Sequence, residues 1–159
     1  DRYRARMFDY VKGLFARKLE IFPGIPALLH ELKADRVPMM VTTNTERNVA
    51  DAAISALGWQ YFVDTICGDE VPAGKPAPDM YREAARRIGA KPADCLVFED
   101  SANGMRAAVD AGCVVIGLPE DDEVEVPPEV TEVSQLRNSR HLAGARASEV
   151  YEWFSKISE

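Results

Sequence analysis

The stretch VFEDSANGMRAAVDAGCVVIG, residues 97–117, contains the end of one strand, a helix and a second strand. The apolar run CLVFE (95–99) predicts a buried strand, and residues 102–111 predict a helix that Gly112 closes. The run CVVIG (113–117) predicts the next strand. Strands that are almost wholly apolar and alternate with helices are typical of a parallel sheet with helices on both faces. We therefore expect an α/β fold.

The rest of the chain repeats this alternation. Strands are predicted at VPMMVT and DTIC, and helices near residues 26–33, 48–57 and 78–88. Apolar residues at helical spacing predict an amphipathic helix over residues 3–19 and a helix at the C-terminus that docks on the sheet. The acidic, proline-punctuated segment 119–136 allows at most one short edge strand.

Composition limits the partners that this protein can have. Its 159 residues carry a formal net charge of −7, which disfavours nucleic acid because such a partner needs a clustered positive face. No apolar run approaches the roughly 18 residues of a membrane span, and no signal-peptide pattern is present, so we expect no membrane partner and a cytoplasmic location. Cys67, Cys95 and Cys113 are expected to be buried free thiols. The oligomeric state is not determined by the sequence.

Polar residues at strand ends are the candidates for chemistry, because ligands of open parallel sheets collect outside the carboxyl ends of the strands. Thr42, Thr43 and Asn44 end the run MMVTTN and offer hydroxyl, amide and backbone N–H donors. The same residue types also favour helix caps and turns. On this stretch alone, a cap or a turn is the better explanation.

Lys75 is the one cation in the loop GDEVPAGKPAPD (68–79), where it lies between Gly74 and Pro76. A solvated lysine is the usual explanation for such a residue. However, the prolines and the glycine restrict this backbone, which favours an ammonium held in a fixed place. An acidic protein that binds an anion needs such a local positive group.

Glu99 and Asp100 follow the apolar run CLVF directly. Adjacent strand residues face opposite sides, so both carboxylates can serve one site only if the strand ends between them or one acts through water. Oxygen-only ligation suits Mg²⁺, which takes one or two carboxylates plus phosphate and water. The alternative is a capping acid beside Ser101 at the start of the next helix, which explains one acid but not two. We therefore favour a metal site.

Taken in order, the strand ending in Thr-Asn, GKPAPDMY (74–81), VFEDSANGMRAA (97–108) and the Ala-Gly pair before a strand resemble the haloacid dehalogenase superfamily. Within that superfamily, the chain resembles the subgroup that contains beta-phosphoglucomutase and phosphoglycolate phosphatase. The resemblance covers about residues 22–119. It implies a Rossmann-like core over residues 21–159, with residues 1–20 as a remnant of the family's helical cap.

The resemblance also implies a role for each candidate residue. Thr43 would hydrogen-bond the transferring phosphoryl group, and Asn44 would contribute to phosphate contact. Lys75 would neutralise the phosphoryl oxygens and the nucleophile. Glu99 and Asp100 would hold Mg²⁺, with Asp100 the more secure ligand. The expected function is a Mg²⁺-dependent phosphatase that acts on a small phosphorylated metabolite.

One family motif is absent from this sequence. The family's nucleophile is the first Asp of a DxD motif on the first strand, and no Asp here is followed two positions later by another. That strand would lie between the strand ending in Thr43 and the strand ending in Glu99, so we expect a gap in the sheet there. A chain that begins with Asp1 and a cap-like helix favours a piece of a longer protein over a rearranged relative. Alone, it is expected to have no turnover.

Two other functions remain open at this stage. A phosphosugar mutase would return the phosphoryl group to a sugar, and a non-catalytic relative would keep only the phosphate and metal site. A signalling receiver domain also combines acids, Thr and Lys on a parallel sheet. There the acids come first, whereas here the order is Thr43, Lys75, then Glu99 and Asp100, which counts against it.

Overall fold

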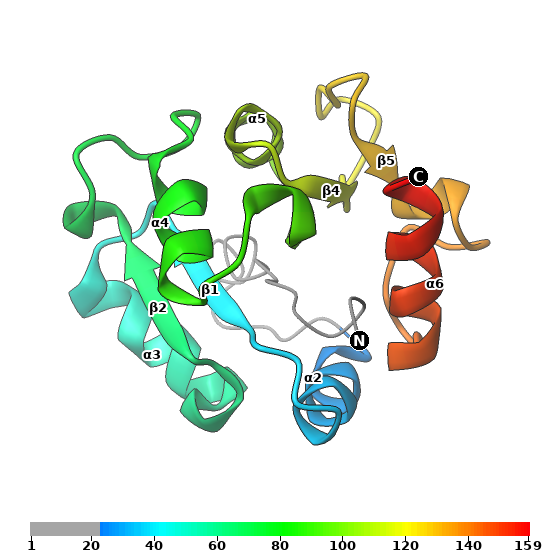
Figure 1. Cartoon of the computed structure of the whole chain (residues 1–159), viewed down its shortest axis with the longest axis horizontal. Coiled ribbons are helices and arrows are strands. Elements are labelled where there is room, and N and C mark those ends of the chain that lie inside the picture. The colour runs from blue at the N-terminus through cyan, green and yellow to red at the C-terminus, as the bar shows by residue number, and fades with distance from the viewer. Residues whose placement is uncertain (1–22) are drawn as a thin grey trace.

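The computed structural model describes residues 23–159, so the predicted helix over residues 3–19 and the proposed cap remnant over 1–20 lie outside the described residues. The described helices are α2 (Ile25–Ala34), α3 (Arg47–Leu57), α4 (Asp79–Arg87), α5 (Ala102–Ala111) and α6 (Ala147–Ile157). The strands are β1 (Met40–Thr43), β2 (Asp64–Cys67), β3 (Leu96–Glu99), β4 (Val114–Gly117) and β5 (Thr131–Glu132). The predicted alternation of strands and helices is confirmed (Figure 1).

β1 begins later than the sequence predicted. The run VPMMVT was expected to be extended from residue 37, whereas the strand spans Met40–Thr43. Pro38 has no N–H to donate to a ladder, so the paired segment starts beyond it. The end of the strand also differs by one residue, since Thr43 is the last residue of β1 rather than the first residue after it.

All strand pairs are parallel, and they form two separate ladders. β1 pairs with β2 in register from Met40 opposite Asp64 to Thr43 opposite Cys67. In the second ladder β3 pairs with β4, and the two-residue β5 lies at the outer edge of β4. Within residues 23–159 no ladder joins β1 to β3, so the expected gap in the sheet is present.

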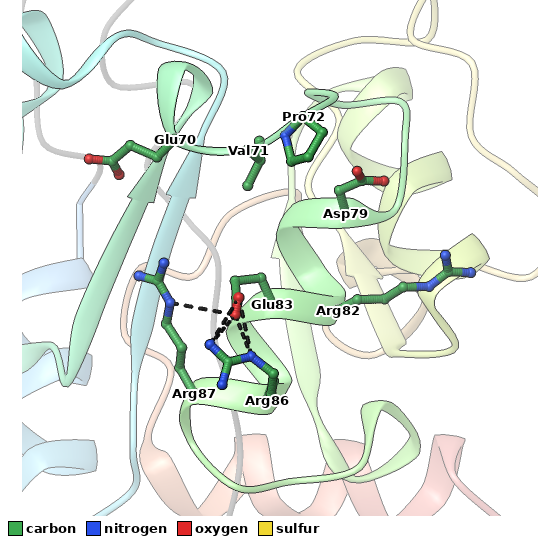
Figure 2. Close-up of a pocket in the computed structure, with 8 residues that line it drawn as sticks. All are labelled: Glu70, Val71, Pro72, Asp79, Arg82, Glu83, Arg86 and Arg87. Carbon is green, nitrogen blue, oxygen red and sulfur yellow. Dashed lines mark hydrogen bonds and ion pairs between the residues drawn. The ribbon is translucent and has the colours of Figure 1, made fainter.

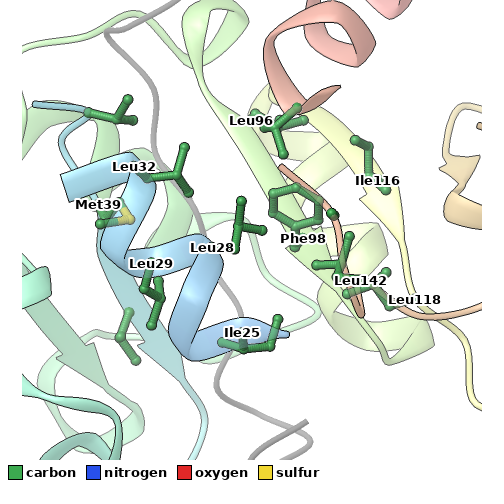
Figure 3. Close-up of a cluster of buried hydrophobic side chains, with 14 of the residues drawn as sticks. Ile25, Leu28, Leu29, Leu32, Met39, Leu96, Phe98, Ile116, Leu118 and Leu142 are labelled. Carbon is green, nitrogen blue, oxygen red and sulfur yellow. The ribbon is translucent and has the colours of Figure 1, made fainter. Parts of the chain in front are cut away.

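Helices cover both faces of these strands, as the α/β prediction requires. Along β3, Leu96 and Phe98 pack in a cluster with α2, α3 and α6, whereas Val97 packs in a second cluster with α4 and α5. This alternation follows from the two-residue period of a strand. Figure 3 shows the first cluster, in which Leu28 and Leu32 of α2 lie opposite β3. Each cluster contains residues of both ladders, so the two clusters connect the ladders across the gap on both faces of the strands.

Both ends of α5, the helix that follows β3, are fixed by capping residues. The Ser101 hydroxyl accepts a hydrogen bond from the Gly104 N–H at 3.0 Å and so caps α5. At the other end Gly112 adopts φ 92°, a left-handed conformation that glycine enters without strain. Because Ser101 supplies the cap, neither Glu99 nor Asp100 is needed for that purpose.

Cys67 and Cys95 are buried and Cys113 is half-buried, and all three are free thiols, so the burial prediction was wrong only for Cys113. β5 is the single short edge strand that the segment 119–136 allowed. None of the helices in residues 23–159 has the length and apolar character to cross a bilayer.

Candidate active site at the strand ends

The Lys75 ammonium lies between the carboxyl ends of β1 and β3. Its Nζ donates to the Thr42 carbonyl at 3.1 Å and to Glu99 Oε1 at 2.6 Å. The side chains of Lys75 and Glu99 are only 0% and 1% exposed. The restricted loop therefore holds a fixed ammonium, as its prolines and glycine predicted, and this ammonium bridges the gap between the two ladders.

Glu99 is held on several sides. The Tyr81 hydroxyl of α4 donates to Glu99 Oε1 at 2.7 Å, and the Ser101 hydroxyl lies 3.4 Å from Oε2. A Cβ at Gly104 would lie 2.0 Å from the Glu99 carboxyl carbon, so only glycine permits this carboxylate to approach the first turn of α5. The partial positive charge of a helix N-terminus favours an anion there.

Asp100 lies just beyond the end of β3 and is half-buried. The strand thus ends between the two acids, so the alternation of strand residues does not force Asp100 onto the face opposite Glu99. Glu99 lies on the face of β3 that packs against α4 and α5, since it follows Val97 by two residues.

Thr43 is the last residue of β1, and Asn44 follows it at the same edge. Thr43 is buried, and its Oγ1 accepts a hydrogen bond from the Thr45 N–H at 3.1 Å. Asn44 is exposed, and its side chain is hydrogen-bonded to the backbone of Lys75. The structure therefore brings Lys75 and Glu99 into direct contact and connects Asn44 to the same lysine through the loop backbone.

The beginning of the Lys75 loop is anchored by Arg47 at the start of α3. The Arg47 guanidinium donates to both carboxylate oxygens of Glu70, at 3.0 and 2.8 Å, and to Thr65 and Asp51. The hydrogen bond with Glu70 raises the pKa of Arg47, and the same contact holds the pKa of the Glu70 carboxyl below its usual range. This ion pair joins α3 and β2 to the loop that carries Lys75.

Sequence reasoning did not find Tyr81 and Arg47. Tyr81 is fully buried on α4 and contacts both members of the central pair, with Lys75 Nζ 4.9 Å from its ring centroid. Its position in the motif GKPAPDMY, six residues after Lys75, was a signal that could have been used. Arg47 had no comparable signal, because Thr65 and Glu70, the partners that join it to β2 and to the loop, lie 18 and 23 residues further along the chain.

The described residues do not complete a metal site by themselves. Across residues 23–159 no three His, Cys, Asp or Glu side chains gather closely enough to hold a metal ion. Glu99 and Asp100 nevertheless supply the oxygen donors that Mg²⁺ prefers, and Mg²⁺ commonly takes only one or two carboxylates from the protein. The donor chemistry at the end of β3 therefore fits this ion.

A hollow of about 450 Å³ lies between residues 70–72 of the Lys75 loop and helix α4 (Figure 2). Arg82, Arg86 and Arg87 of α4 line it, together with three acids, Glu70, Asp79 and Glu83. Glu83 forms ion pairs with both Arg86 and Arg87. The three acids balance the charge of the three arginines, and two of the arginines are paired with Glu83, so we keep the strand ends as the candidate phosphate site.

Several known proteins are similar to this chain in sequence. A bifunctional riboflavin kinase/FMN phosphatase from Arabidopsis thaliana is 42% identical over 104 residues, covering 64% of this chain and 27% of that protein. Protein CbbY from Rhodobacter capsulatus is 34% identical over 125 residues, covering 76% and 55%. The chain thus spans about a quarter and about half of the length of these two relatives.

Solved structures of related proteins are similar to this chain in fold. CbbY from Rhodobacter sphaeroides in complex with phosphate has a TM-score of 0.69 at 30% identity, covering 87% of this chain and 62% of that one. A putative beta-phosphoglucomutase from Thermotoga maritima has a TM-score of 0.61 at 26% identity, covering 85% and 60%. A family profile described as haloacid dehalogenase-like hydrolase matches residues 1–112. The chain therefore belongs to the haloacid dehalogenase-like hydrolase family.

Proposed function

We propose that this chain is the core of a Mg²⁺-dependent phosphatase that acts on a small phosphorylated metabolite such as a sugar phosphate. The observation that carries the proposal is the buried Lys75 ammonium between the ends of β1 and β3, in direct contact with Glu99. Membership of the hydrolase family and relatives named as phosphatases support it. The complex of CbbY with phosphate supports the choice of ligand.

Lys75 supplies positive charge where a phosphoryl group would gather negative charge. A phosphoryl oxygen at ~4 Å from an ammonium gains on the order of 4 kcal/mol at an effective dielectric of about 20. Because the ammonium is already oriented by Thr42 and Glu99, little reorganisation is needed when the charge develops. Thr43 contributes its hydroxyl from the last position of β1.

Asp100 would hold Mg²⁺, with Glu99 beside it at the end of β3. When bound, the ion would polarise a phosphoryl oxygen and neutralise part of its charge. The protein itself keeps the Glu99 carboxylate against the Lys75 ammonium and out of water, with Asp100 directly after the same strand. The ion pair between Lys75 and Glu99 limits the net negative charge that a phosphate would otherwise meet.

The covalent step requires an Asp that this chain does not supply, since no DxD motif occurs in it. We assign phosphoryl transfer to such an Asp outside the chain, followed by transfer to water. Uncatalysed phosphomonoester hydrolysis is slow enough that acceleration up to ~10²¹-fold can be needed. Charge stabilisation by Lys75 alone does not supply that factor, so residues 1–159 by themselves are expected to have no turnover.

The test is an assay of the intact protein on a panel of phosphomonoesters with magnesium. Asp100→Asn and Lys75→Ala are each expected to lower kcat/KM by at least about 10²-fold. Lys91→Ala is the matched control, because Lys91 is exposed and lies before β3, at the opposite end of that strand from Glu99. Undiminished activity in either site variant would overturn the assignment.

A phosphosugar mutase is the second candidate, favoured by the structural likeness to a putative beta-phosphoglucomutase. Product analysis separates the two: a phosphatase releases inorganic phosphate, whereas a mutase yields an isomeric sugar phosphate. A third outcome, binding of magnesium and phosphate by calorimetry without either product, would identify a non-catalytic relative.

A further inference from the structure

The Asn44 side chain forms two hydrogen bonds with the backbone of a single residue, Lys75, 31 positions later in the chain. Its Oδ1 accepts from the Lys75 N–H at 2.8 Å, and its Nδ2 donates to the Lys75 carbonyl at 3.0 Å. This orientation of the amide is the one that satisfies both backbone groups, since a flipped amide would place donor against donor and acceptor against acceptor. The two hydrogen bonds therefore join the Asn44 side chain to both backbone polar groups of Lys75.

Two glycines permit this close approach. A Cβ at Gly74 would lie 2.7 Å from Asn44 Oδ1, and a Cβ at Gly68 would lie 2.1 Å from the Asn44 carbonyl oxygen. Neither glycine has a positive φ, so neither is required for its backbone conformation. Their missing side chains instead make room for Asn44 at the two places where the loop passes it.

Two residues at the carboxyl end of β1 thus bind Lys75, one at its backbone and one at its side-chain nitrogen. Asn44 binds the lysine backbone, and the Thr42 carbonyl accepts from the lysine Nζ at 3.1 Å. Between these two points the side chain runs across the strand ends to Glu99. With the backbone and the ammonium both tied to β1, the ammonium has little freedom to move away from the gap.

We propose that Asn44 is a positioning residue, whose side chain fixes the backbone of Lys75 and thereby sets where the ammonium lies. This differs from direct contact of the Asn44 side chain with phosphate. The kinetic part of the proposal rests on the proposed phosphatase function, whereas the structural part does not. The two parts are therefore tested by different measurements.

The structural test measures hydrogen exchange of the Lys75 amide by NMR in the intact protein. Asn44→Ala removes both hydrogen bonds and is expected to speed exchange about tenfold or more. Asn44→Asp keeps an oxygen that accepts from the Lys75 N–H but sets its second oxygen against the Lys75 carbonyl, so protection of the amide should lie between that of wild type and that of Asn44→Ala. Asn48→Ala is the matched control, because Asn48 is an exposed asparagine on the first turn of α3. Asn44 is also exposed, so its variants are expected to fold.

A second structural readout is acylation of lysines followed by mass spectrometry. Lys75 is buried, whereas Lys33, Lys91 and Lys156 are exposed and serve as internal references. Relative to these three, labelling of Lys75 should rise about tenfold in Asn44→Ala and stay at the wild-type level in Asn48→Ala. Exchange and labelling of Lys75 within twofold of wild type in Asn44→Ala would overturn the proposal.

The kinetic test compares Asn44→Ala in two backgrounds. If Asn44 acts through Lys75, the variant lowers kcat/KM about tenfold in the wild-type protein and has no further effect once Lys75 is Ala. If its side chain contacts phosphate independently, the two losses multiply, and the positioning role is overturned. If the protein shows no phosphatase activity, the proposed function fails, and exchange and labelling still decide the role of Asn44.

Discussion

Lys75 Nζ and Glu99 Oε1 lie 2.6 Å apart, and both side chains are excluded from solvent. Removing two charges from water is costly, and their attraction repays this cost only when further hydrogen bonds satisfy the pair. The Thr42 carbonyl and the Tyr81 hydroxyl supply two such bonds. The pair is therefore sensitive to the loss of either partner.

Glu99→Gln is expected to destabilise the protein by about 3–5 kcal/mol, because it leaves a buried ammonium without its counter-charge. Urea denaturation in metal-free buffer measures the change in the free energy of unfolding. Arg140→Ala is the control, since it breaks an ion pair in which the Asp122 side chain is 92% exposed, and should cost at most about 1 kcal/mol. A cost for Glu99→Gln no larger than that of the control would contradict the buried pair.

Gly104→Ala is expected to destabilise the protein, against the usual helix preference for alanine. In an ordinary helix interior, alanine is favoured over glycine by about 1 kcal/mol. Here the new Cβ would lie 2.0 Å from the Glu99 carboxyl carbon, so the carboxylate must shift away from Lys75. Asn103→Ala, at the neighbouring exposed position of α5, should instead be neutral or slightly stabilising. Thermal unfolding of both variants decides the sign.

The Arg47 ion pair with Glu70 predicts a pH dependence. The pKa of the Glu70 carboxyl is held below its usual range, chiefly by the Arg47 hydrogen bond. A depressed carboxyl pKa adds stability above the unfolded-state pKa of about 4.3, and this stability is lost as the pH falls through the folded-state pKa. Wild type should thus exceed Glu70→Gln in stability at pH 7 by about 1 kcal/mol or less, and the difference should shrink as the pH falls below about 4.3.

Urea denaturation of wild type and Glu70→Gln across this pH range measures that difference. Glu152→Gln, an exposed carboxyl on α6, is the matched control and should give a much smaller one. A difference between wild type and Glu70→Gln that stays constant from pH 7 to pH 3 would contradict the assigned role of Arg47.

The three cysteines should react at different rates with a thiol-alkylating reagent at pH 8. Burial raises the pKa of the Cys67 thiol to about 11, so very little of the reactive thiolate is present. Cys95 is also buried, whereas Cys113 is half-buried. Cys113 should therefore be labelled first, and Cys67 and Cys95 only after denaturation, as peptide mass spectrometry can follow. Rapid labelling of Cys67 in the native protein would contradict its placement.

Most of the fold could be predicted because its signals are local. The apolar runs before Thr43 and Glu99 predicted buried strands, and Ser101 and Gly112 bounded α5 as expected. The start of β1 was misplaced, since the apolar pattern continues through Pro38, which cannot donate to a ladder. The gap between the ladders was expected from the family resemblance, which local patterns alone could not have indicated.

The candidate site could be predicted only in part. The sequence identified Lys75, Glu99 and Asp100 as an unusual group of charges, but it did not indicate that Lys75 and Glu99 pair directly. That contact joins residues 24 positions apart, and it depends on how the Lys75 loop packs across β1. The role of Asn44 was hidden for the same reason, because a contact over 31 positions leaves no periodic pattern in the sequence.

The close approach of Asn44 to Gly74 also constrains how this protein can evolve. A side chain at position 74 is excluded only while the amide occupies the space beside it, at 2.7 Å from where a Cβ would lie. The two positions are therefore epistatic: a larger residue at 74 becomes tolerable only after the residue at 44 has become smaller. If position 74 became larger before position 44 became smaller, the intermediate protein would have a displaced Lys75.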